Sequence, residues 1–131
     1  MSIKQMTIPE DFILGAAASA WQTEGWSGKK AGQDSWIDLW YKNDRQVWHN
    51  GYGPAVATDF INRFREDVAL MKQAGLTHYR TSINWSRFLT DYENATVDEE
   101  YAAYYDALFA EMHRQGIEPM ICLEHYELPG V

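Results

Sequence analysis

The sequence predicts an α/β fold with a parallel sheet, and three observations support this prediction. Short apolar runs alternate with longer segments of helical periodicity along the 131 residues. Each long helical segment ends at a glycine, and a new apolar run follows closely. No repeat, low-complexity tract or interdomain linker interrupts this order. Such alternation is typical of parallel strands joined by right-handed crossovers.

The first strand is predicted over residues 12–18, an apolar run whose small residues suggest that another backbone approaches closely. A polar stretch punctuated by glycines then runs over about residues 19–57, far longer than an ordinary connection. We expect one helical turn in it, around residues 35–41. An ordered, functional loop is favoured over a disordered one by three tryptophans, Trp26, Trp36 and Trp40.

From Asp59 the hydrophobic period becomes that of a helix. Apolar side chains recur at helical spacing over residues 60–71, charged residues occupy the other face, and Gly75 ends the helix. A second strand is predicted over residues 77–85, where apolar side chains alternate with Arg80, Ser82 and Asn84. One face of this strand is therefore polar and carries a cation.

A second long helix and a third strand complete the pattern. Thr96 and Glu99 fit a capping box, and an apolar stripe follows over residues 101–112 and ends at Gly116. Residues 119–124 are predicted to be a buried parallel strand. Three strands and two helices leave both faces of the sheet partly bare. We therefore expect an N-terminal portion, about three βα units, of a TIM (β/α)8 barrel of roughly 250 residues or more.

Composition and charge are those of a globular domain. Hydrophobic residues make up 46% of the chain, which is ample for a core. A formal net charge of −8 argues against nucleic acid as a partner. Neither a signal peptide nor an apolar run long enough to span a membrane is visible in the sequence. We expect a soluble, cytoplasmic protein, and the sequence does not fix its oligomeric state.

Polar side chains lie where the predicted strands end, and in α/β folds this edge holds ligands. Gln22 lies between two tryptophans after the first strand. An amide beside aromatic rings suits the hydroxyl groups and C–H faces of a sugar, and the alternative is a turn held by glutamine. Arg80 can keep an adjacent carboxylate ionised or form a structural ion pair inside the barrel. His125, after the third strand, is a hydroxyl-binding or a core histidine.

Other kinds of chemistry find no support in the sequence. His125 shares no ligand-like spacing with the other histidines, the single cysteine Cys122 cannot form an internal disulfide, and no nucleotide-binding motif occurs. We therefore expect no metal and no cofactor. Glu124 and Glu127 are a tempting pair of catalytic carboxylates, but they lie three residues apart at one strand end. Glycosidases take their two carboxylates from positions that converge across the site.

Four blocks of the sequence together resemble family 1 glycoside hydrolases. They occur in family order, at residues 12–25, 67–72, 79–87 and 116–120 with 125–129. The resemblance implies a (β/α)8 barrel that cleaves β-glycosides with retention through two glutamates. Both glutamates belong to motifs expected beyond Val131, Asn-Glu-Pro and Glu-Asn-Gly, and neither motif occurs here. This chain, residues 1–131, is then the N-terminal fragment of a single barrel catalytic domain and holds no catalytic residue.

The resemblance also implies roles for residues of this chain. Gln22 and His125 would hydrogen-bond the hydroxyl groups of the sugar in the first subsite, and Arg80 would contact the nucleophile. The family commonly has His-Trp-Asp-Leu-Pro where this chain has His125-Tyr126-Glu127-Leu128-Pro129. Members that act on 6-phosphorylated sugars tend to replace that tryptophan with phenylalanine or tyrosine.

Tyr126 therefore implies a substrate-binding wall suited to a small phosphorylated β-glucoside, as in a 6-phospho-β-glucosidase. Two alternatives from the same family are a β-glucosidase and a 6-phospho-β-galactosidase. An alternative of another class is a non-catalytic carbohydrate-binding fragment.

Overall fold

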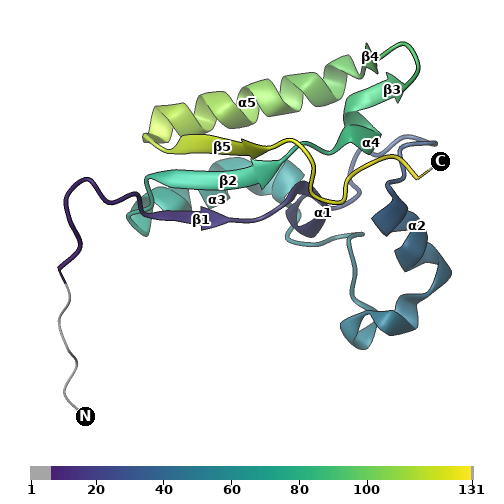
Figure 1. Cartoon of the computed structure of the whole chain (residues 1–131), viewed down its shortest axis with the longest axis horizontal. Helices are drawn as coiled ribbons and strands as arrows, with labels where there is room; N and C mark the ends of the chain where they lie inside the picture. The colour runs from purple at the N-terminus through teal and green to yellow at the C-terminus, as the bar shows by residue number, and fades with distance from the viewer. Residues whose placement is uncertain (1–6, 131) are drawn as a thin grey trace.

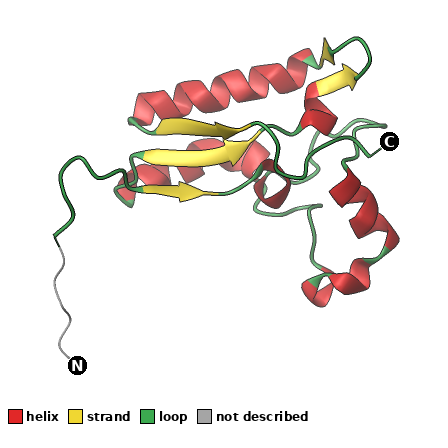
Figure 2. Cartoon of the chain, in the orientation of Figure 1, coloured by secondary structure: helices red, strands yellow, loops and turns green. Residues whose placement is uncertain are grey.

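The computed structural model describes residues 7–130, and a three-stranded parallel sheet with two long helices forms its body (Figures 1 and 2). The strands lie in the order β1-β2-β5, with β1 (Gly15–Ala17), β2 (His78–Ser82) and β5 (Glu118–Cys122) all parallel. Helix α3 (Phe60–Gln73) connects β1 to β2, and α5 (Glu99–Gln115) connects β2 to β5. The predicted order of strand, loop, helix, strand, loop, helix and strand is confirmed.

The hydrophobic core lies between the sheet and helices α3 and α5. The helical spacing found in the sequence brings one stripe of each helix inward, as expected for amphipathic helices that cover a sheet. The buried members of this core are Phe60, Phe64, Val68, Tyr79, Tyr101, Tyr105, Leu108, Met112 and Ile117. Helix α5 ends at Gly116, whose φ of 72° is the left-handed conformation that glycine adopts most easily.

The start of α5 differs from the prediction. Asp98, not Thr96, is the N-cap, and its side chain accepts from the backbone N–H groups of Glu100 and Tyr101. The capping box of Thr96 and Glu99 is wrong because Thr96 belongs to strand β4 (Thr96–Val97), too far from the first helical turn. Strand β4 pairs with β3 (Leu89–Asp91) in a hairpin that the sequence did not predict.

The second strand is shorter than predicted. It ends at Ser82, and residues 85–88 form the short helix α4 (Trp85–Phe88) instead of continuing the strand. The reason is a long-range hydrogen bond, since the N–H of Asn84 donates to the hydroxyl of Tyr105 at 2.8 Å. That amide is therefore lost to the ladder of the sheet, and the chain turns away.

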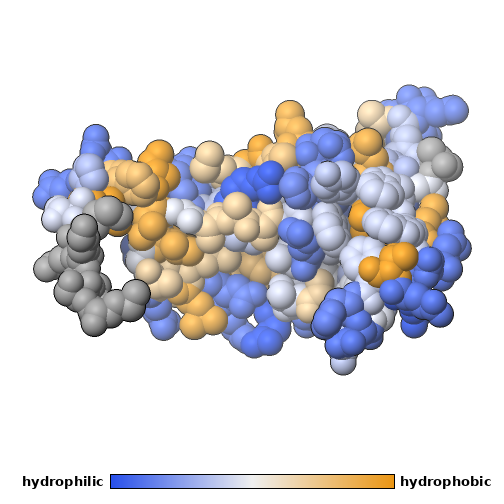
Figure 3. Space-filling model, turned by 60° about the horizontal axis from the view of Figure 1, so that its bottom comes forward, coloured by the Kyte–Doolittle hydropathy of each residue, from blue (hydrophilic) through white to orange (hydrophobic). Residues whose placement is uncertain are grey.

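The expectation that β5 is buried is wrong for this chain. Met120 and Ile121 are exposed, as are Phe12, Ile13 and Leu14 before β1. Helices cover only one face of the sheet in residues 7–130, and its two outer strands, β1 and β5, each have one unpaired edge there. Figure 3 shows the resulting apolar surface on the half of the molecule that holds the sheet.

The long loop after β1 is ordered and lies beyond the carboxyl ends of the strands (Figure 1). It contains α1 (Ala20–Thr23), α2 (Trp36–Asn43) and two turns of 3₁₀ helix, η1 (Arg45–Val47) and η2 (His49–Gly51). The helical turn predicted around residues 35–41 is confirmed and extends to Asn43. Ser35 and Asp38 begin it with a reciprocal capping box.

Candidate active site at the strand ends

Arg80, in the middle of β2, reaches His125, which follows the carboxyl end of β5. Nη2 of Arg80 lies 3.3 Å from Nδ1 of His125, and Nη1 donates to the carbonyl oxygen of Ala18 at 2.9 Å. A guanidinium can only donate, so Nδ1 of His125 accepts in this contact. The proton of a neutral His125 ring then sits on Nε2, where it is available to a ligand.

Gln22 lies on α1, just beyond the end of β1, and its side chain is exposed. The hydroxyl of Ser19 donates to Oε1 of Gln22 at 2.9 Å. This bond fixes the amide plane and leaves the nitrogen on the opposite side of the side chain. Gln22 thus lies on the helix that follows β1, Arg80 lies in the middle of β2, and His125 follows β5.

Tyr126 forms part of an aromatic wall beside His125. Its ring is half exposed, and its centroid lies 5.8 Å from Trp36, which stacks on Trp40 at 6.1 Å. A cleft of about 430 Å³ opens between this wall and the η1 and η2 segment. Its lining consists of Trp21, Trp36, Ile37, Trp40, Val47, Trp48 and Tyr126. Flat aromatic faces of this kind suit the apolar face of a sugar ring or an aryl group.

Glu127 is fully buried, whereas Glu124 is exposed. The carboxylate of Glu127 accepts hydrogen bonds from the hydroxyl of Ser82 at 2.5 Å and from the backbone N–H groups of His125 and Trp21 at 3.0 and 3.3 Å. Burial raises the pKa of Glu127 to about 7, against the lowering effect of these donors. All these donors belong to buried or half-buried groups of the protein, and Glu124 is not among them.

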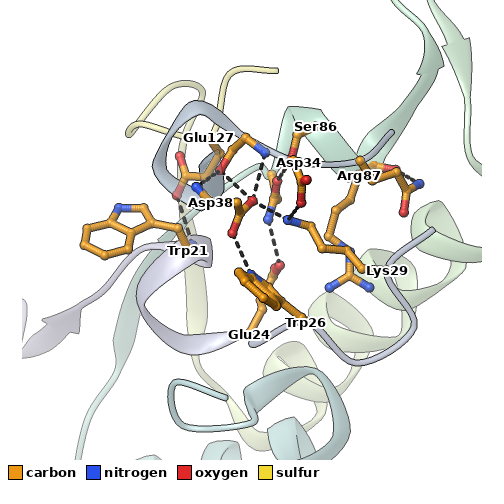
Figure 4. Close-up of polar contacts among 12 residues, drawn as sticks. Trp21, Glu24, Trp26, Lys29, Asp34, Asp38, Ser86, Arg87 and Glu127 are labelled. Carbon is orange, nitrogen blue, oxygen red and sulfur yellow. Dashed lines mark hydrogen bonds and ion pairs between the residues drawn. The ribbon is translucent and has the colours of Figure 1, made fainter. Parts of the chain in front are cut away.

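Glu24 is a second buried carboxylate, and the sequence reasoning missed it (Figure 4). It accepts from the hydroxyls of Tyr101 and Tyr105 and from the amide of Asn84. Burial raises the pKa of Glu24, while Tyr101 and the nearby Arg87 act in the opposite direction. The signal for this cluster was available, because tyrosines on the apolar stripe of a helix need partners for their hydroxyls.

Asp38 holds the inside of the long loop together (Figure 4). Its carboxylate accepts from the indole N–H of Trp26 at 2.6 Å, from the backbone and hydroxyl of Ser35, and from the ammonium of Lys29. Burial works against the charge, yet the Lys29 ammonium and these donors hold the pKa of Asp38 below its ordinary value. Trp26, one of the predicted loop tryptophans, is therefore part of the loop's scaffold.

Neither a metal-binding cluster nor a membrane-spanning helix is present among the described residues. No cluster of three or more histidine, cysteine or acidic side chains within residues 7–130 has the geometry to hold a metal ion. Over the same residues, no helix is both long and apolar enough to cross a bilayer.

A family comparison gives this arrangement of strand-end residues a context. The model of glycosyl hydrolase family 1 matches residues 4–131. The chain belongs to glycosyl hydrolase family 1. The resemblance found in the four sequence blocks is therefore confirmed.

Known family 1 proteins show the extent of the likeness. The chain is 33% identical over 127 residues to 6-phospho-beta-glucosidase GmuD of Bacillus subtilis, covering 96% of this chain and 27% of that protein. It is 36% identical over 129 residues to beta-glucosidase 17 of Arabidopsis thaliana, covering 98% of this chain and 25% of that protein. The chain thus spans about a quarter of the length of these relatives.

The fold agrees with a solved member structure as well. The AHE enzyme of Alicyclobacillus herbarius superposes with a TM-score of 0.85 at 30% identity, over 98% of this chain and 28% of that one. The prediction of an N-terminal portion of a TIM (β/α)8 barrel is confirmed. The parallel β1-β2-β5 sheet with its α3 and α5 crossovers is the start of that barrel.

Proposed function

We propose that this chain is the N-terminal part of a retaining β-glycosidase that hydrolyses 6-phospho-β-D-glucosides to glucose 6-phosphate and an aglycone or sugar. Residues 1–131 form the first part of a single barrel catalytic domain, and both catalytic glutamates lie beyond them. The observation that carries the proposal is the contact of Arg80, on β2, with His125, which follows the neighbouring strand β5. Gln22 lies on the helix that follows the third strand of this sheet, β1.

In the proposed reaction, the residues of this chain bind the sugar and tune the nucleophile. The amide of Gln22 and Nε2–H of His125 donate to ring hydroxyls of the sugar. The guanidinium of Arg80 keeps the carboxylate of the nucleophilic glutamate ionised. One downstream glutamic acid protonates the leaving oxygen while the other attacks the anomeric carbon, and water then releases the glycosyl-enzyme. This chemistry needs no metal and no cofactor.

Two observations support a phosphorylated substrate. Tyr126 stands where the family commonly has tryptophan, and one of the similar proteins is the 6-phospho-beta-glucosidase of Bacillus subtilis. Phosphorylated sugars are charged and do not diffuse across membranes, so the proposed enzyme works in the cytoplasm. The proposed partner is a small phosphorylated β-glucoside. Neither nucleic acid nor a membrane has a part in the proposal.

A neutral β-glucoside is the second candidate substrate, favoured by the 36% identity to the Arabidopsis beta-glucosidase. A paired hydrolysis assay on the full-length protein separates the two. It compares a chromogenic β-glucoside with the same compound phosphorylated at the sugar 6-position. Turnover of the phosphorylated compound alone supports the proposal, and preference for the neutral compound replaces it with the second candidate. Activity on neither favours the carbohydrate-binding alternative.

Replacement of Tyr126 by tryptophan tests whether this residue selects the phosphorylated sugar. We expect Tyr126→Trp to shift the ratio of kcat/KM towards the unphosphorylated glucoside by about tenfold, because one changed wall contact discriminates substrates by this order. Tyr92→Trp is the matched control, since Tyr92 lies on the β3–β4 hairpin. A ratio that Tyr126→Trp leaves unchanged would show that Tyr126 does not select the phosphorylated sugar.

A further inference from the structure

Glu127 lies between the segment that carries Gln22 and the segment that carries His125. Figure 4 shows its carboxylate beside Trp21 of α1. The side chain of Glu127 has no exposed surface. Its three hydrogen-bond donors come from Ser82 at the end of β2, from Trp21 on α1 and from His125 after β5. Two of these donors are distant in sequence, 45 and 106 residues away. One carboxylate therefore connects the segment of Gln22 to the segment of His125.

At the start of α1, Ser82 and Glu127 accept the hydrogen bonds of backbone amides, a role usually taken by the side chain of the N-cap residue. The N-cap residue Ser19 makes no side-chain capping bond, and its hydroxyl donates to Gln22 instead. The N–H of Ala20 donates to Oγ of Ser82 at 2.8 Å, and the hydroxyl of Ser82 donates in turn to Oε1 of Glu127. The amides of Ala20 and Trp21 are thus satisfied from outside the helix, so the Ser19 hydroxyl is free to orient Gln22.

On the β5 side, Glu127 fixes the turn that presents His125. Oε2 accepts from the N–H of His125, two residues earlier, and so closes a small ring around Tyr126. Tyr126 has a φ of 74°, a left-handed conformation that a residue with a large side chain adopts only when its surroundings hold it there. The contact of Arg80 with Nδ1 then sets the orientation of the His125 ring.

We propose that Glu127 is a positioning residue. It holds the side chains of Gln22 and His125 in the relative positions needed to bind hydroxyl groups of the same sugar ring. The inference rests on the proposed function, because it takes Gln22 and His125 as the groups that bind sugar hydroxyls. Burial disfavours the ionised form of the Glu127 carboxyl, and its raised pKa reflects this free-energy cost. Strongly perturbed groups of this kind are concentrated at functional sites.

Two variants test separately the hydrogen bonds that connect Glu127 to α1 and the one that connects it to His125. In Glu127→Gln the single amide oxygen serves Ser82 and Trp21, which share Oε1, so the amide nitrogen faces the N–H of His125 and that bond is lost. In Ser82→Ala the amide of Ala20 loses its acceptor and the Gln22 side is loosened. Glu118→Gln is the control, an exposed glutamate of β5.

The measurement is the kcat/KM of the full-length enzyme for the parent substrate and for analogues that each lack one ring hydroxyl. A well-placed hydrogen bond makes the wild-type enzyme discriminate against the matching deoxy analogue. His125→Ala and Gln22→Ala identify which hydroxyl each residue binds. We expect Glu127→Gln to reduce the discrimination at the His125 hydroxyl by about tenfold, and Ser82→Ala to do the same at the Gln22 hydroxyl.

The outcomes are distinct. If Glu127→Gln and Ser82→Ala lower kcat/KM equally for the parent and all deoxy analogues, Glu127 is a structural residue and the inference is wrong. If His125→Ala and Gln22→Ala alter discrimination at no hydroxyl, the proposed roles of these two residues fail, and the inference fails with them. Should Glu127→Gln not fold, Ser82→Ala alone decides, because it leaves the carboxylate in place.

Discussion

Replacing Arg80 by methionine in the full-length enzyme is expected to lower kcat by about 10²–10³-fold, with a smaller change in KM. The guanidinium of Arg80 contacts the carbonyl oxygen of Ala18 and Nδ1 of His125, so it joins β1, β2 and the segment after β5. If it also faces the nucleophile, its charge stabilises the ionised carboxylate that attacks the sugar. Methionine fills similar space but offers neither charge nor donors.

The pH profile distinguishes a loss of charge from a loss of structure. Without the cation the nucleophile is harder to ionise, so the acid limb of kcat/KM should move to higher pH in Arg80→Met. Arg80→Lys keeps a charge but loses the planar fork that reaches two acceptors, and we expect activity between wild type and Arg80→Met. Arg63→Met is the control, because Arg63 is exposed on α3 and pairs with Glu66 on the same helix. Wild-type kcat in Arg80→Met would remove Arg80 from the proposed mechanism.

The order of strands and helices could be predicted because it depends on local hydrophobic period. Phe60, Phe64 and Val68 recur at helical spacing, and they are buried in the structure as that spacing requires. The end of α5 at Gly116 could be predicted from glycine alone, whereas the end of β2 and the start of α5 depended on distant partners and could not. The second strand ends at Ser82, and the amide of Asn84 just beyond it donates to Tyr105, 21 residues later, instead of to a neighbouring strand. Asp98 caps α5 and also binds Lys30 from the long loop.

The same distinction between local pattern and distant partners applies to the candidate site. Gln22, Arg80 and His125 were predicted at one edge because parallel strands place their carboxyl ends together. The buried carboxylates were not predicted as such, because nothing near Glu24 or Glu127 in sequence indicates which donors surround them. Glutamate is rarely buried without partners. For Glu24 the available hint was distant in sequence, because the hydroxyls of Tyr101 and Tyr105 on the apolar stripe of α5 need partners.

Replacing Glu24 by alanine is expected to destabilise the folded protein by about 3–5 kcal/mol, the usual cost of removing one member of a buried charged cluster. The hydroxyls of Tyr101 and Tyr105 and the amide of Asn84 would lose their common acceptor. Arg87, itself buried, would lose the nearby negative charge. Urea unfolding of the full-length protein measures the change. Glu93→Ala, at an exposed position of the β3–β4 turn, should stay within about 0.5 kcal/mol of wild type.

The pH dependence of this loss gives a second test. Burial raises the pKa of Glu24 above its ordinary value, so the folded state binds the proton more tightly than the unfolded state does. The contribution of Glu24 to stability is therefore greatest below the ordinary carboxyl pKa of about 4.3, and it falls as pH rises through the folded value. Glu24→Gln cannot ionise, so its free energy of unfolding should decline less over that rise in pH. Parallel pH curves for Glu24→Gln and wild type would mean that Glu24 stays ionised throughout, held by Arg87 and the two tyrosines.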